Sequence, residues 1–524
     1  MDVKPINGVN LRQDGYDMDK SQWMSMQNAD YTHKEMFEQI PGSVRFHGTS
    51  LGTGNPSAIM VCYNDDENRG DILVAVDDQI FRKTEGENEF ESLIGGLPSN
   101  GIKFSVNLNN KQYIPHKETG LYEYDGVSTI TKINEVKMTD MIYSRETDRF
   151  FGISSEDQKQ LFWTDGLTHK DNNGAPLTWP GMNVMVFPPT GGDVIERLHF
   201  FRGRLVLFMN NSIWLMYVNG GPSNWRPEKT PTAVGIIAPK TLQQVGTELW
   251  FLGYSPKTGR GIYAFDGVTS RLLSYDVEPY IDRANDDRIY EACAEYVNNI
   301  YKISLPIDGA TENNRTLHLD PININRLKES PNVYGPHTYG FNCSTTLNTK
   351  RFRGQHLFGR VRSSEARIYR VHEEYQTQYS SEMSDNGDLI PVELLTGVLT
   401  DVQVEKVIYD STWLKRYGKI FLYHPPLGSY SAKIEIFKDD ENDLISDYLA
   451  YLEGHTDTIE SLILGTTPLE RNSEVDNIHL EHILAYAIQF RISSEQVNQK
   501  VSFKSLQYDA IPVRRKKVVQ NVQI

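Results

Sequence analysis

Cysteine is scarce in this sequence: the 524 residues include three, Cys62, Cys293 and Cys343. Three cysteines so far apart exclude a disulfide framework and lack the paired spacing of a structural zinc site. Isolated cysteines of this kind are usually reduced, buried side chains. The stretch from Met1 to Asn10 has neither the basic nor the apolar segment of a secretory signal, so we expect the chain to fold in a cytoplasm.

Positive charge is also in deficit. The chain has 53 Lys and Arg residues against 69 Asp and Glu, which gives a net charge of −16. This balance argues against a protein that wraps nucleic acid tightly, because phosphate binding needs clustered Lys and Arg. Long apolar runs are missing as well, and none approaches the ~18 residues of a membrane-spanning helix. The sequence therefore predicts neither nucleic-acid wrapping nor membrane insertion.

Aromatic residues, in contrast, are plentiful, with 28 Tyr, 21 Phe and 7 Trp. Short aromatic and β-branched runs bounded by Gly, Asn and Asp recur between residues 45 and 380, where extended helical periods are rare. Several runs end in an Asp-Gly or Asn-Gly pair, a signal for tight hairpins that need a positive φ. These pairs are Asp125-Gly126, Asp165-Gly166, Asn219-Gly220 and Asp266-Gly267.

The strands that carry this pattern recur at intervals of 40 to 55 residues. Their opening aliphatic residues are Ile80, Leu121, Leu161, Ile213, Ile262, Leu317 and Ile368. Such a period is typical of propeller blades, because a small twisted sheet buries both faces only by stacking on its neighbours. We predict an all-β protein with a β-propeller of six to eight blades over residues 46–380. The alternative is a pair of ordinary β-sandwiches with unrelated Asp-Gly turns.

The segments on either side of the repeats follow different patterns. Residues 1–45 are polar and weakly periodic, and we expect an extended N-terminal arm. Residues 381–512 contain longer strands, which predict an additional C-terminal β-sandwich domain. Residues 513–524 form a basic tail on an acidic chain, either a solvated end or a docking strip for a partner subunit. The candidate docking residues are Arg514, Arg515, Lys516 and Lys517.

A search for chemistry finds no catalytic constellation. The Gly-rich stretch Gly48 to Asn55 lacks the spacing and the Lys-Ser/Thr ending of a phosphate loop, and the acidic run Asn64 to Asp71 lacks the closing Glu of a calcium loop. The histidines are scattered without metal-ligand spacing, among them His47, His116, His169, His199 and His455. We therefore predict no catalytic, metal-binding or cofactor-binding residues, and a protein that is not an enzyme.

Three stretches together resemble one family. The first is Ile40-Pro41-Gly42-Ser43, and the second and most specific runs from Val234 through Gly235-Ile236-Ile237-Ala238-Pro239 to Glu278. The third is Trp413-Leu414-Lys415-Arg416-Tyr417-Gly418-Lys419-Ile420. In this order they are similar to segments of the tail hub or nozzle proteins of short-tailed, P22-like bacteriophages, a group that includes the DNA-stabilisation protein.

The resemblance implies a structural virion protein. Its subunits would form a ring of six below the portal and adaptor rings of the tail, with a channel that retains the packaged genome and later passes it. The implied partners are other copies of the chain, the portal-adaptor ring, a tail fibre or tailspike, needle or plug proteins and, transiently, double-stranded DNA. The implied location is the virion tail, assembled in the host cytoplasm.

The acidic charge is compatible with this reading, because a channel wall poor in Lys and Arg passes DNA without holding it. An acidic surface kept for solubility is the alternative explanation of the same charge. Two other function classes stay open: a glycan-binding or glycan-cleaving propeller, and a host scaffold that binds other proteins.

Overall fold

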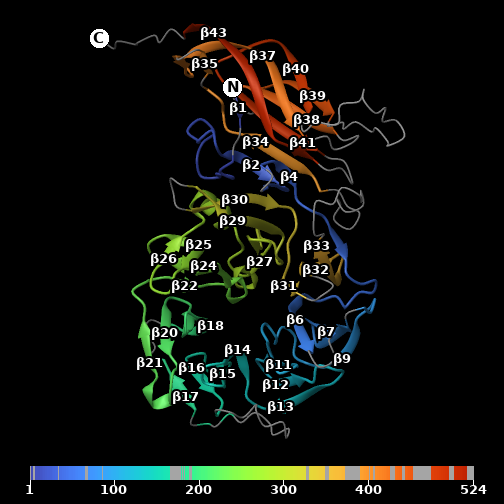
Figure 1. The fold of residues 1–524 in the computed structure, drawn as a ribbon, viewed down its shortest axis with the longest axis vertical. Helices are drawn as coiled ribbons and strands as arrows, with labels where there is room; N and C mark the ends of the chain where they lie inside the picture. Colours follow the sequence, from blue (N-terminus) through green and yellow to red (C-terminus); the bar gives the residue numbers. More distant parts are fainter. Residues whose placement is uncertain are drawn as a thin grey trace, which may run out of the picture. The chain divides into compact units, whose positions relative to one another are not determined.

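A computed structural model describes most of the chain. The described residues are 2–3, 6–32, 35–64, 69–84, 86–165, 179, 181, 183–187, 192–325, 330–348, 353–371, 390–400, 402–404, 407–424, 431–439, 443–451, 474–494 and 501–515. They form two compact units (Figure 1). Unit 1 consists of Met1–Ser43, Leu317–Thr338 and Glu373–Ile524, and unit 2 of Val44–Thr316 and Tyr339–His372.

Successive antiparallel sheets make up the β-propeller, whose strands pair in chain order within each sheet. The first two sheets are β6 (Pro56–Asn64), β7 (Arg69–Val76), β8 (Gln79–Thr84) and β9 (Glu91–Ile94), then β10 (Val106–Leu108), β11 (Lys111–His116), β12 (Gly120–Tyr124) and β13 (Ile130–Asn134). The next two are β14 (Met138–Ser144), β15 (Arg149–Ser154), β16 (Gln160–Trp163) and β17 (Val184–Val186), then β18 (Ile195–Phe201), β19 (Arg204–Met209), β20 (Ile213–Tyr217) and β21 (Arg226–Lys229).

Three more sheets complete the seven found in the described part of the chain. The fifth has β22 (Gly235–Ile236) and β23 (Gln243–Val245) on one side of β24 (Glu248–Ser255), followed by β25 (Gly259–Phe265) and β26 (Ser270–Leu272). The sixth is β27 (Cys293–Val297), β28 (Ile300–Leu305), β29 (Arg315–Asn325) and β30 (Ser330–His337). The seventh is β31 (Cys343–Asn348), β32 (Arg353–Arg362), β33 (Glu365–Val371) and β5 (Ser43–Arg45). Short helices lie between strands: η1 (Pro222–Asn224), η2 (Pro239–Thr241), η3 (Tyr275–Val277), α1 (Glu278–Ile281) and η4 (Ile289–Glu291).

The seventh sheet closes the ring. Its last strand, β5, comes from the segment that precedes the first sheet, so the two ends of the propeller segment are joined by strand pairing. Phe46 continues this pairing, since its N–H donates to the carbonyl of Ile368 at 2.9 Å. The sequence predicts a propeller of six to eight blades, and the structure has seven.

Apolar side chains fill the interfaces between successive sheets. Between the third and fourth sheets, Phe151 and Trp225 pack with ring centroids 5.3 Å apart, and between the fourth and fifth, Phe208 and Phe251 pack at 5.0 Å. Similar clusters join the first sheet to the second and to the seventh. Burying one large apolar side chain contributes about 1.5–3 kcal/mol to the stability of the fold. The sheets are therefore stable only when they stack on one another.

The Asp-Gly and Asn-Gly pairs occupy equivalent positions, but they do not form the two-residue hairpins that the sequence suggests. Each of the four pairs follows the third strand of its sheet, although Gly166 lies outside the described residues. The Asp125 carboxylate accepts the N–H groups of Val127, Ser128 and Thr129, and Asp266 accepts those of Val268 and Thr269. The Asp therefore stabilises a longer loop through its side chain, while Gly126, Gly220 and Gly267 supply the positive φ.

The two-residue hairpins with positive φ lie elsewhere. Asn109-Asn110, Arg202-Gly203 and Asn298-Asn299 join the first and second strands of the second, fourth and sixth sheets, and both residues of each pair have φ between 51° and 71°. These are type I′ turns in form, whose twist matches that of the strands. Asn, like Asp, enters this region at a lower cost than most residues, so Asn-Asn does here what Asp-Gly is expected to do.

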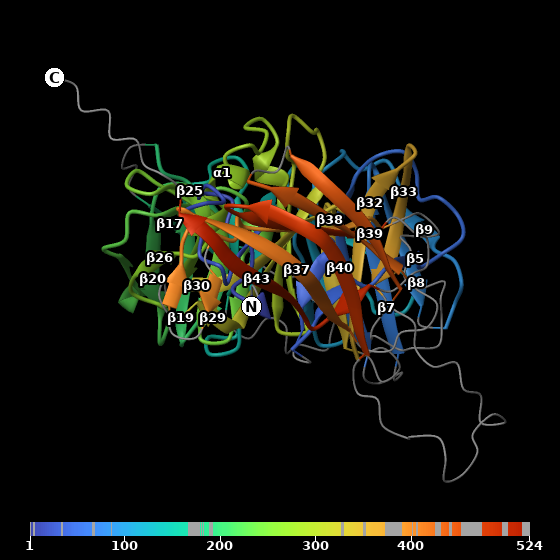
Figure 2. The same cartoon turned by 90° about the horizontal axis from the view of Figure 1, so that it is seen from above.

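Unit 1 includes residues 317–338, which carry most of β29 and β30 of the sixth sheet, and is otherwise a β-sandwich built from two larger sheets. The first is β1 (Asp2–Val3), β43 (Ser505–Arg515), β37 (Trp413–His424) and β40 (Glu474–Ala485), and the second is β2 (Trp23–Gln27), β34 (Val392–Thr396), β41 (Ile488–Ser494), β38 (Ser431–Lys438) and β39 (Leu444–Tyr451). Smaller sheets pair β3 (Ala29–Tyr31), β4 (Phe37–Gln39) and β42 (Ser502–Phe503), and β35 (Val402–Val404) with β36 (Val407–Tyr409). The long strands β37, β40 and β43 run side by side in Figure 2. Phe490 of the second sheet meets Tyr508 of the first with ring centroids 5.8 Å apart, which places the sandwich core between the two sheets.

The N-terminal residues are not an extended arm, which corrects the expectation for residues 1–45. They supply β1 to β4 to the sheets of unit 1. Trp23 is 1% exposed and meets Phe37 edge to face at 5.1 Å, while Phe37 stacks on Phe503 at 5.1 Å. Strands of two to five residues are too short to show a period, so the polar composition hid their buried aromatic residues.

The first residues of the expected basic tail, residues 513–524, belong to a strand. Val513, Arg514 and Arg515 are the last residues of β43, and Arg514 and Arg515 pair with Leu414 and Trp413 of β37. Lys516 and Lys517 lie outside the described residues. Among the residues that the structure describes, no helix is long and apolar enough to cross a membrane.

Candidate functional site

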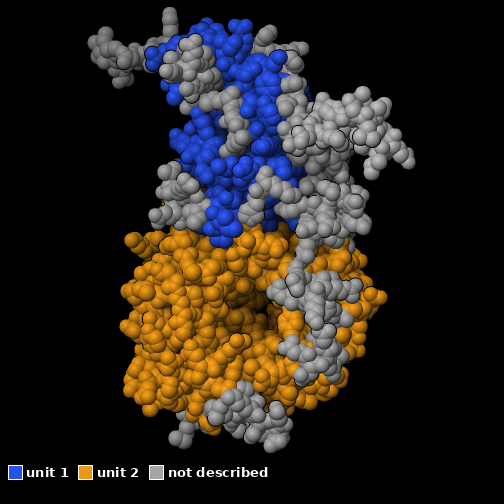
Figure 3. Space-filling model, viewed as in Figure 1, with its two compact units in different colours: residues 1–43, 317–338, 373–524 blue, residues 44–316, 339–372 orange. Residues whose placement is uncertain are grey.

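A cavity of about 200 Å³ lies at the centre of unit 2. Its walls come from β6, β18, β23, β27 and β31, which hold the first position of their sheets, and from residues 103–105 before β10. Because strands of five different sheets and the segment that leads into a sixth line one space, this cavity marks the axis of the propeller. Figure 3 shows a hollow at the middle of unit 2.

An ion pair occupies one wall of this axial cavity. The guanidinium of Arg197 donates to the carboxylate of Asp140, which also accepts the backbone N–H groups of Leu198 and Met141, both at 2.8 Å. The Asp140 side chain is fully buried, and this burial raises its pKa against the lowering effect of Arg197. The Arg197 guanidinium carbon lies 3.5 Å from the centre of the Phe104 ring, so the cation is also held by an aromatic face.

A second pair lies further along the chain, in the segment of the family resemblance. The Lys240 ammonium donates to Glu291 and to the carbonyl of Asn342, each at 2.9 Å. Burial lowers the pKa of Lys240, but the carboxylate of Glu291 outweighs this effect and the pKa is raised overall. Lys103 has no such neighbour at bonding distance in the described lining, and burial lowers its pKa.

A second cavity, of about 270 Å³, shares Ser57, Lys103 and Lys240 with the first and so continues it. Its lining adds Lys117 and Arg288, and two acidic residues, Glu291 and Glu312. Both volumes lie below the ~300–1,000 Å³ of ordinary small-molecule sites. The described lining includes aromatic residues, Phe104 and Tyr290, but no tryptophan.

The thiols around the axis are not activated as nucleophiles. Burial raises the pKa of the Cys293 thiol to about 11 and raises that of Cys343 further, so both are thiols at neutral pH. Burial raises the pKa of Glu295 to about 7, although the hydroxyls of Thr346 and Ser344 donate to its carboxylate. The described lining of the cavities contains polar and charged groups suited to holding a small ion or water. The absence of enzymatic activity stays a prediction.

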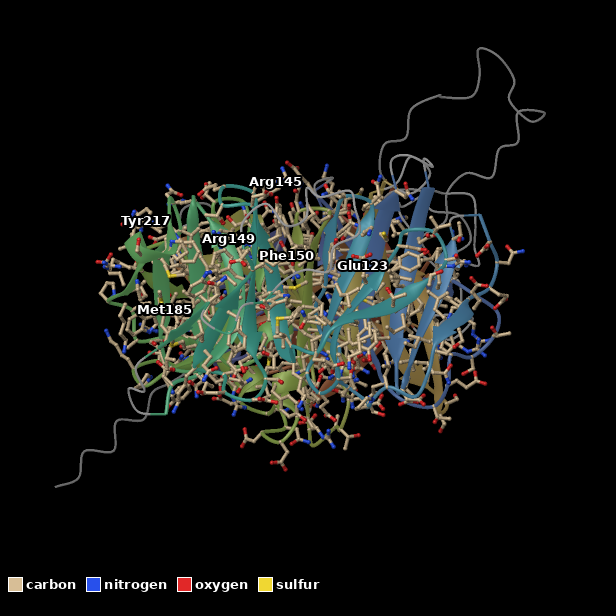
Figure 4. All side chains as sticks on the ribbon, turned by 90° about the horizontal axis from the view of Figure 1, so that it is seen from below. Glu123, Arg145, Arg149, Phe150, Met185 and Tyr217 are labelled. Carbon is tan, nitrogen blue, oxygen red and sulfur yellow. The ribbon has the colours of Figure 1, made fainter. Side chains whose placement is uncertain are left out.

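The described Asp-Gly and Asn-Gly residues named from the sequence follow the third strands of their sheets and do not line the axial cavities, whereas Gly166 lies outside the described residues. On the outer part of unit 2, Tyr217 at the end of β20 is 48% exposed, in contrast to the buried Phe150 of β15 (Figure 4). The singled-out histidines are also apart: burial lowers the pKa of His47 and of His199 to about 4, and His116 accepts two backbone N–H groups. His169 and His455 lie outside the described residues.

The sheet of long strands in unit 1 has an unusual exposed face. Seven residues of β37 and β43 have exposed side chains: Arg416, Lys419, Asp509, Ile511, Val513, Arg514 and Arg515. Arg416 pairs across the strands with Ile511 on one side and with Leu484 of β40 on the other, which places all three on one face. Ile511 is 62% exposed and Leu484 46%. We refer to these eight exposed residues together as the β43 face, although Arg514 and Arg515 are consecutive in the strand and point to opposite sides of its end. The β43 face combines basic with apolar side chains.

Sequence spacing missed one cluster, in unit 1. His318 of β29 and His337 of β30 both approach the carboxylate of Asp30 of β3: the distances are 2.7 Å from Nδ1 of His318 and 3.2 Å from Nε2 of His337. Asp30 is separated from His318 by 288 residues, so motif searches could not have joined them. Among the residues that the structure describes, this is the one group of three with ligand atoms close enough to share a metal ion.

Comparisons with known proteins give little beyond the fold. No family model matches the chain, and no curated protein is significantly similar to it. Similar solved structures include the extracellular domain of the putative one component system BT4673 from B. thetaiotaomicron, at 10% identity with a TM-score of 0.34, where the match covers 64% of this chain and 52% of the other.

The extracellular domain of the putative hybrid two component system BT3049 from the same organism matches at 10% identity with a TM-score of 0.41, covering 88% of this chain and 58% of the other. The Neurospora crassa Pan2 WD40 domain matches at 8% identity with a TM-score of 0.37, covering 64% of this chain and 97% of the other. The chain thus spans little more than half the length of the two sensor domains. Likeness at this level carries no functional argument, so the site must be interpreted from its own residues.

Proposed function

We propose that this chain is the nozzle or hub subunit of a short-tailed phage tail, where copies of it form a ring that retains the packaged genome and passes it at ejection. The observation that carries the proposal is the β43 face, where four basic and three apolar side chains are exposed on a chain of net charge −16. Apolar residues exposed together with Arg are typical of protein interfaces.

The β43 face includes the third stretch of the family resemblance. Residues 413–420 of that stretch begin β37, and Arg416 and Lys419 are its exposed members. Lys415, in contrast, is fully buried and donates to the carbonyls of Asp410, Trp413 and Tyr486. The motif thus divides into a part that fixes the strand and a part available to a partner.

The DNA channel in this proposal lies between subunits and not along the propeller axis. The axial cavities hold about 200 and 270 Å³ and are lined by Arg197, Lys240 and Glu291, which belong to the two ion pairs. A duplex needs far more room, since its major groove alone is ~12 Å wide. A ring of several copies supplies such a channel, while one propeller does not.

A closed ring requires heterologous contacts, in which one surface of a subunit meets a different surface of the next. The β43 face differs in charge from the rest of the surface, because it is basic while the chain as a whole is acidic. It can therefore contact a different surface of the next subunit. Contact between this face and an acidic surface of the neighbouring copy is attractive, whereas two β43 faces repel each other. This favours ring closure over a two-fold dimer.

The test is the assembly state of the purified chain, measured by mass photometry and by averaging particles in electron micrographs, with the single variants Ile511→Asp and Arg514→Glu. We expect rings for the native chain and a marked loss of rings for both variants. Val268→Asp is the matched control, because Val268 is 56% exposed and lies in unit 2. A chain that stays monomeric with and without the portal-adaptor ring would favour the scaffold alternative.

The genome-retention part has a separate test. Particles assembled without this protein are expected to lose packaged DNA, which a nuclease-protection assay measures. Normal retention in such particles would refute the nozzle assignment even if rings form. The glycan alternative predicts saturable binding of an oligosaccharide library to the propeller, and the described cavity linings lack the tryptophans that such sites commonly use.

A further inference from the structure

Three strands from distant parts of the chain bring Asp30, His318 and His337 together within unit 1. One ligand atom from each residue lies within 4.8 Å of the other two. The imidazole rings of His318 and His337 have centroids 4.0 Å apart. Their side chains are 2% and 0% exposed, and that of Asp30 is 15% exposed.

The cluster is held in place by a neighbouring amide. Asn28, which is fully buried, donates from its side chain to the hydroxyl of Thr338 at 2.8 Å and to the carbonyl of Pro391 at 2.7 Å. Its side-chain oxygen accepts the N–H of Thr338 at 2.8 Å. The two bonds to Thr338 join the residue just after His337 to the segment that carries Asp30, and the third ties this segment to Pro391. The positions of two ligands are therefore fixed relative to each other before anything binds.

Electrostatics disfavours the simplest explanation, a carboxylate paired with two charged imidazoles. Two imidazolium rings 4.0 Å apart repel each other, and their burial costs several kcal/mol per ion. Two neutral imidazoles leave the buried carboxylate without a compensating positive charge. One protonated and one neutral imidazole would balance the carboxylate with a proton, and a single divalent cation between the three donors balances it with both rings as neutral ligands.

We propose that Asp30, His318 and His337 bind one divalent transition-metal ion, with zinc the best match. Two imidazole nitrogens and one carboxylate oxygen are ligands that zinc accepts at about 2.0–2.2 Å. At that bond length neighbouring ligand atoms of a tetrahedral site lie about 3.3 Å apart, and the spacings here, from 2.7 Å up to the 4.8 Å limit, bracket this value. Three protein ligands leave a fourth position for water.

The experiment measures zinc in the full-length chain after removal of metal with a chelator and reloading with zinc chloride. We expect one zinc per chain by emission spectrometry, and at a zinc concentration 100 times the Kd an about 100-fold shift of the folding equilibrium of unit 1. Asp30→Asn and His337→Gln should abolish stoichiometric binding, and Asn28→Gly should weaken it about 10–100-fold. His116→Gln is the matched control, a buried histidine of unit 2 bonded to backbone.

Cobalt(II) provides a readout that does not depend on the variants folding. In the native chain we expect the intense visible absorption of tetrahedral cobalt, displaced by zinc in a one-to-one titration. Absence of stoichiometric zinc and of this absorption in the native chain would overturn the proposal. So would zinc binding that persists unchanged in a folded Asp30→Asn variant, since the metal would then be held elsewhere.

Discussion

The Arg197–Asp140 pair at the propeller axis allows a sharp test of the structure. Replacing Arg197 by Met keeps an unbranched apolar side chain, but it removes the guanidinium that lies over the Phe104 ring and is the cation next to a fully buried carboxylate. Removing one partner of a buried ion pair typically costs 3–5 kcal/mol, because the remaining charge is left uncompensated. Asp140 keeps two backbone N–H donors, from Leu198 and Met141, so we expect the lower end, about 3 kcal/mol.

This loss should depend on pH. Burial already raises the pKa of Asp140 in the native chain, and without Arg197 it should rise further. A carboxyl group whose pKa is higher in the folded than in the unfolded state binds more protons when folded, so stability falls as pH rises between the two pKa values. The difference between Arg197→Met and the native chain should therefore be smaller at acid pH than at pH 8.

Urea unfolding followed by tryptophan fluorescence measures both effects, since Trp163 and Trp225 lie in the cluster between the third and fourth sheets. Arg271→Met is the matched control: its pair with Glu248 is exposed, and such pairs contribute only about 0–1 kcal/mol. The double variant Arg197→Met, Asp140→Asn should recover much of the loss. A variant Arg197→Met as stable as Arg271→Met at pH 8 would refute the reasoning.

Two further predictions concern single positions in unit 2. Burial raises the pKa of Glu295 to about 7, so the native chain should lose stability relative to Glu295→Gln as pH rises from about 4.5 to 7 and show no further change above that, which thermal melts across the pH range would measure. Gly126→Ala should destabilise more than Gly267→Ala in urea titrations. Both glycines have positive φ, but a Cβ at Gly126 would lie 2.0 Å from the carbonyl oxygen of Asn110, whereas at Gly267 the nearest atom is 3.4 Å away; equal losses would contradict this.

Much of the propeller could be predicted from the sequence because each blade repeats the same local pattern of a strand followed by a turn. The run from Gly120 to Gly126 shows a buried third strand followed by an Asp that binds three backbone N–H groups, and Gly259 to Gly267 repeats it. Both the side-chain alternation and the turn are local properties of the chain. They therefore appear in the sequence even where the copies have diverged.

The parts that the sequence did not predict depend on pairing between distant residues. β5 joins the seventh sheet across more than 300 residues, and the Trp23–Phe37–Phe503 stack joins the two ends of the chain. No period or spacing marks such contacts, because each strand is two to five residues long. The Asp30–His318–His337 cluster escaped for the same reason: its members are ordinary residues on separate strands until the fold brings them together.

The charges at the propeller axis bear on the proposed function, and the amino-acid composition alone does not show where these charges lie. Lys103, Arg197 and Lys240 give the propeller axis positive groups, yet Arg197 and Lys240 are neutralised by their own carboxylate partners. The axial cavities are thus small and lined by paired charges, and the proposed function rests on the surface of the chain. There the exposed basic residues of β43 and β37 stand out against the net charge of −16. Were these residues used in contacts between subunits, the surface left for a DNA channel would be more acidic still, and each phosphate passing it would meet few cations to hold it.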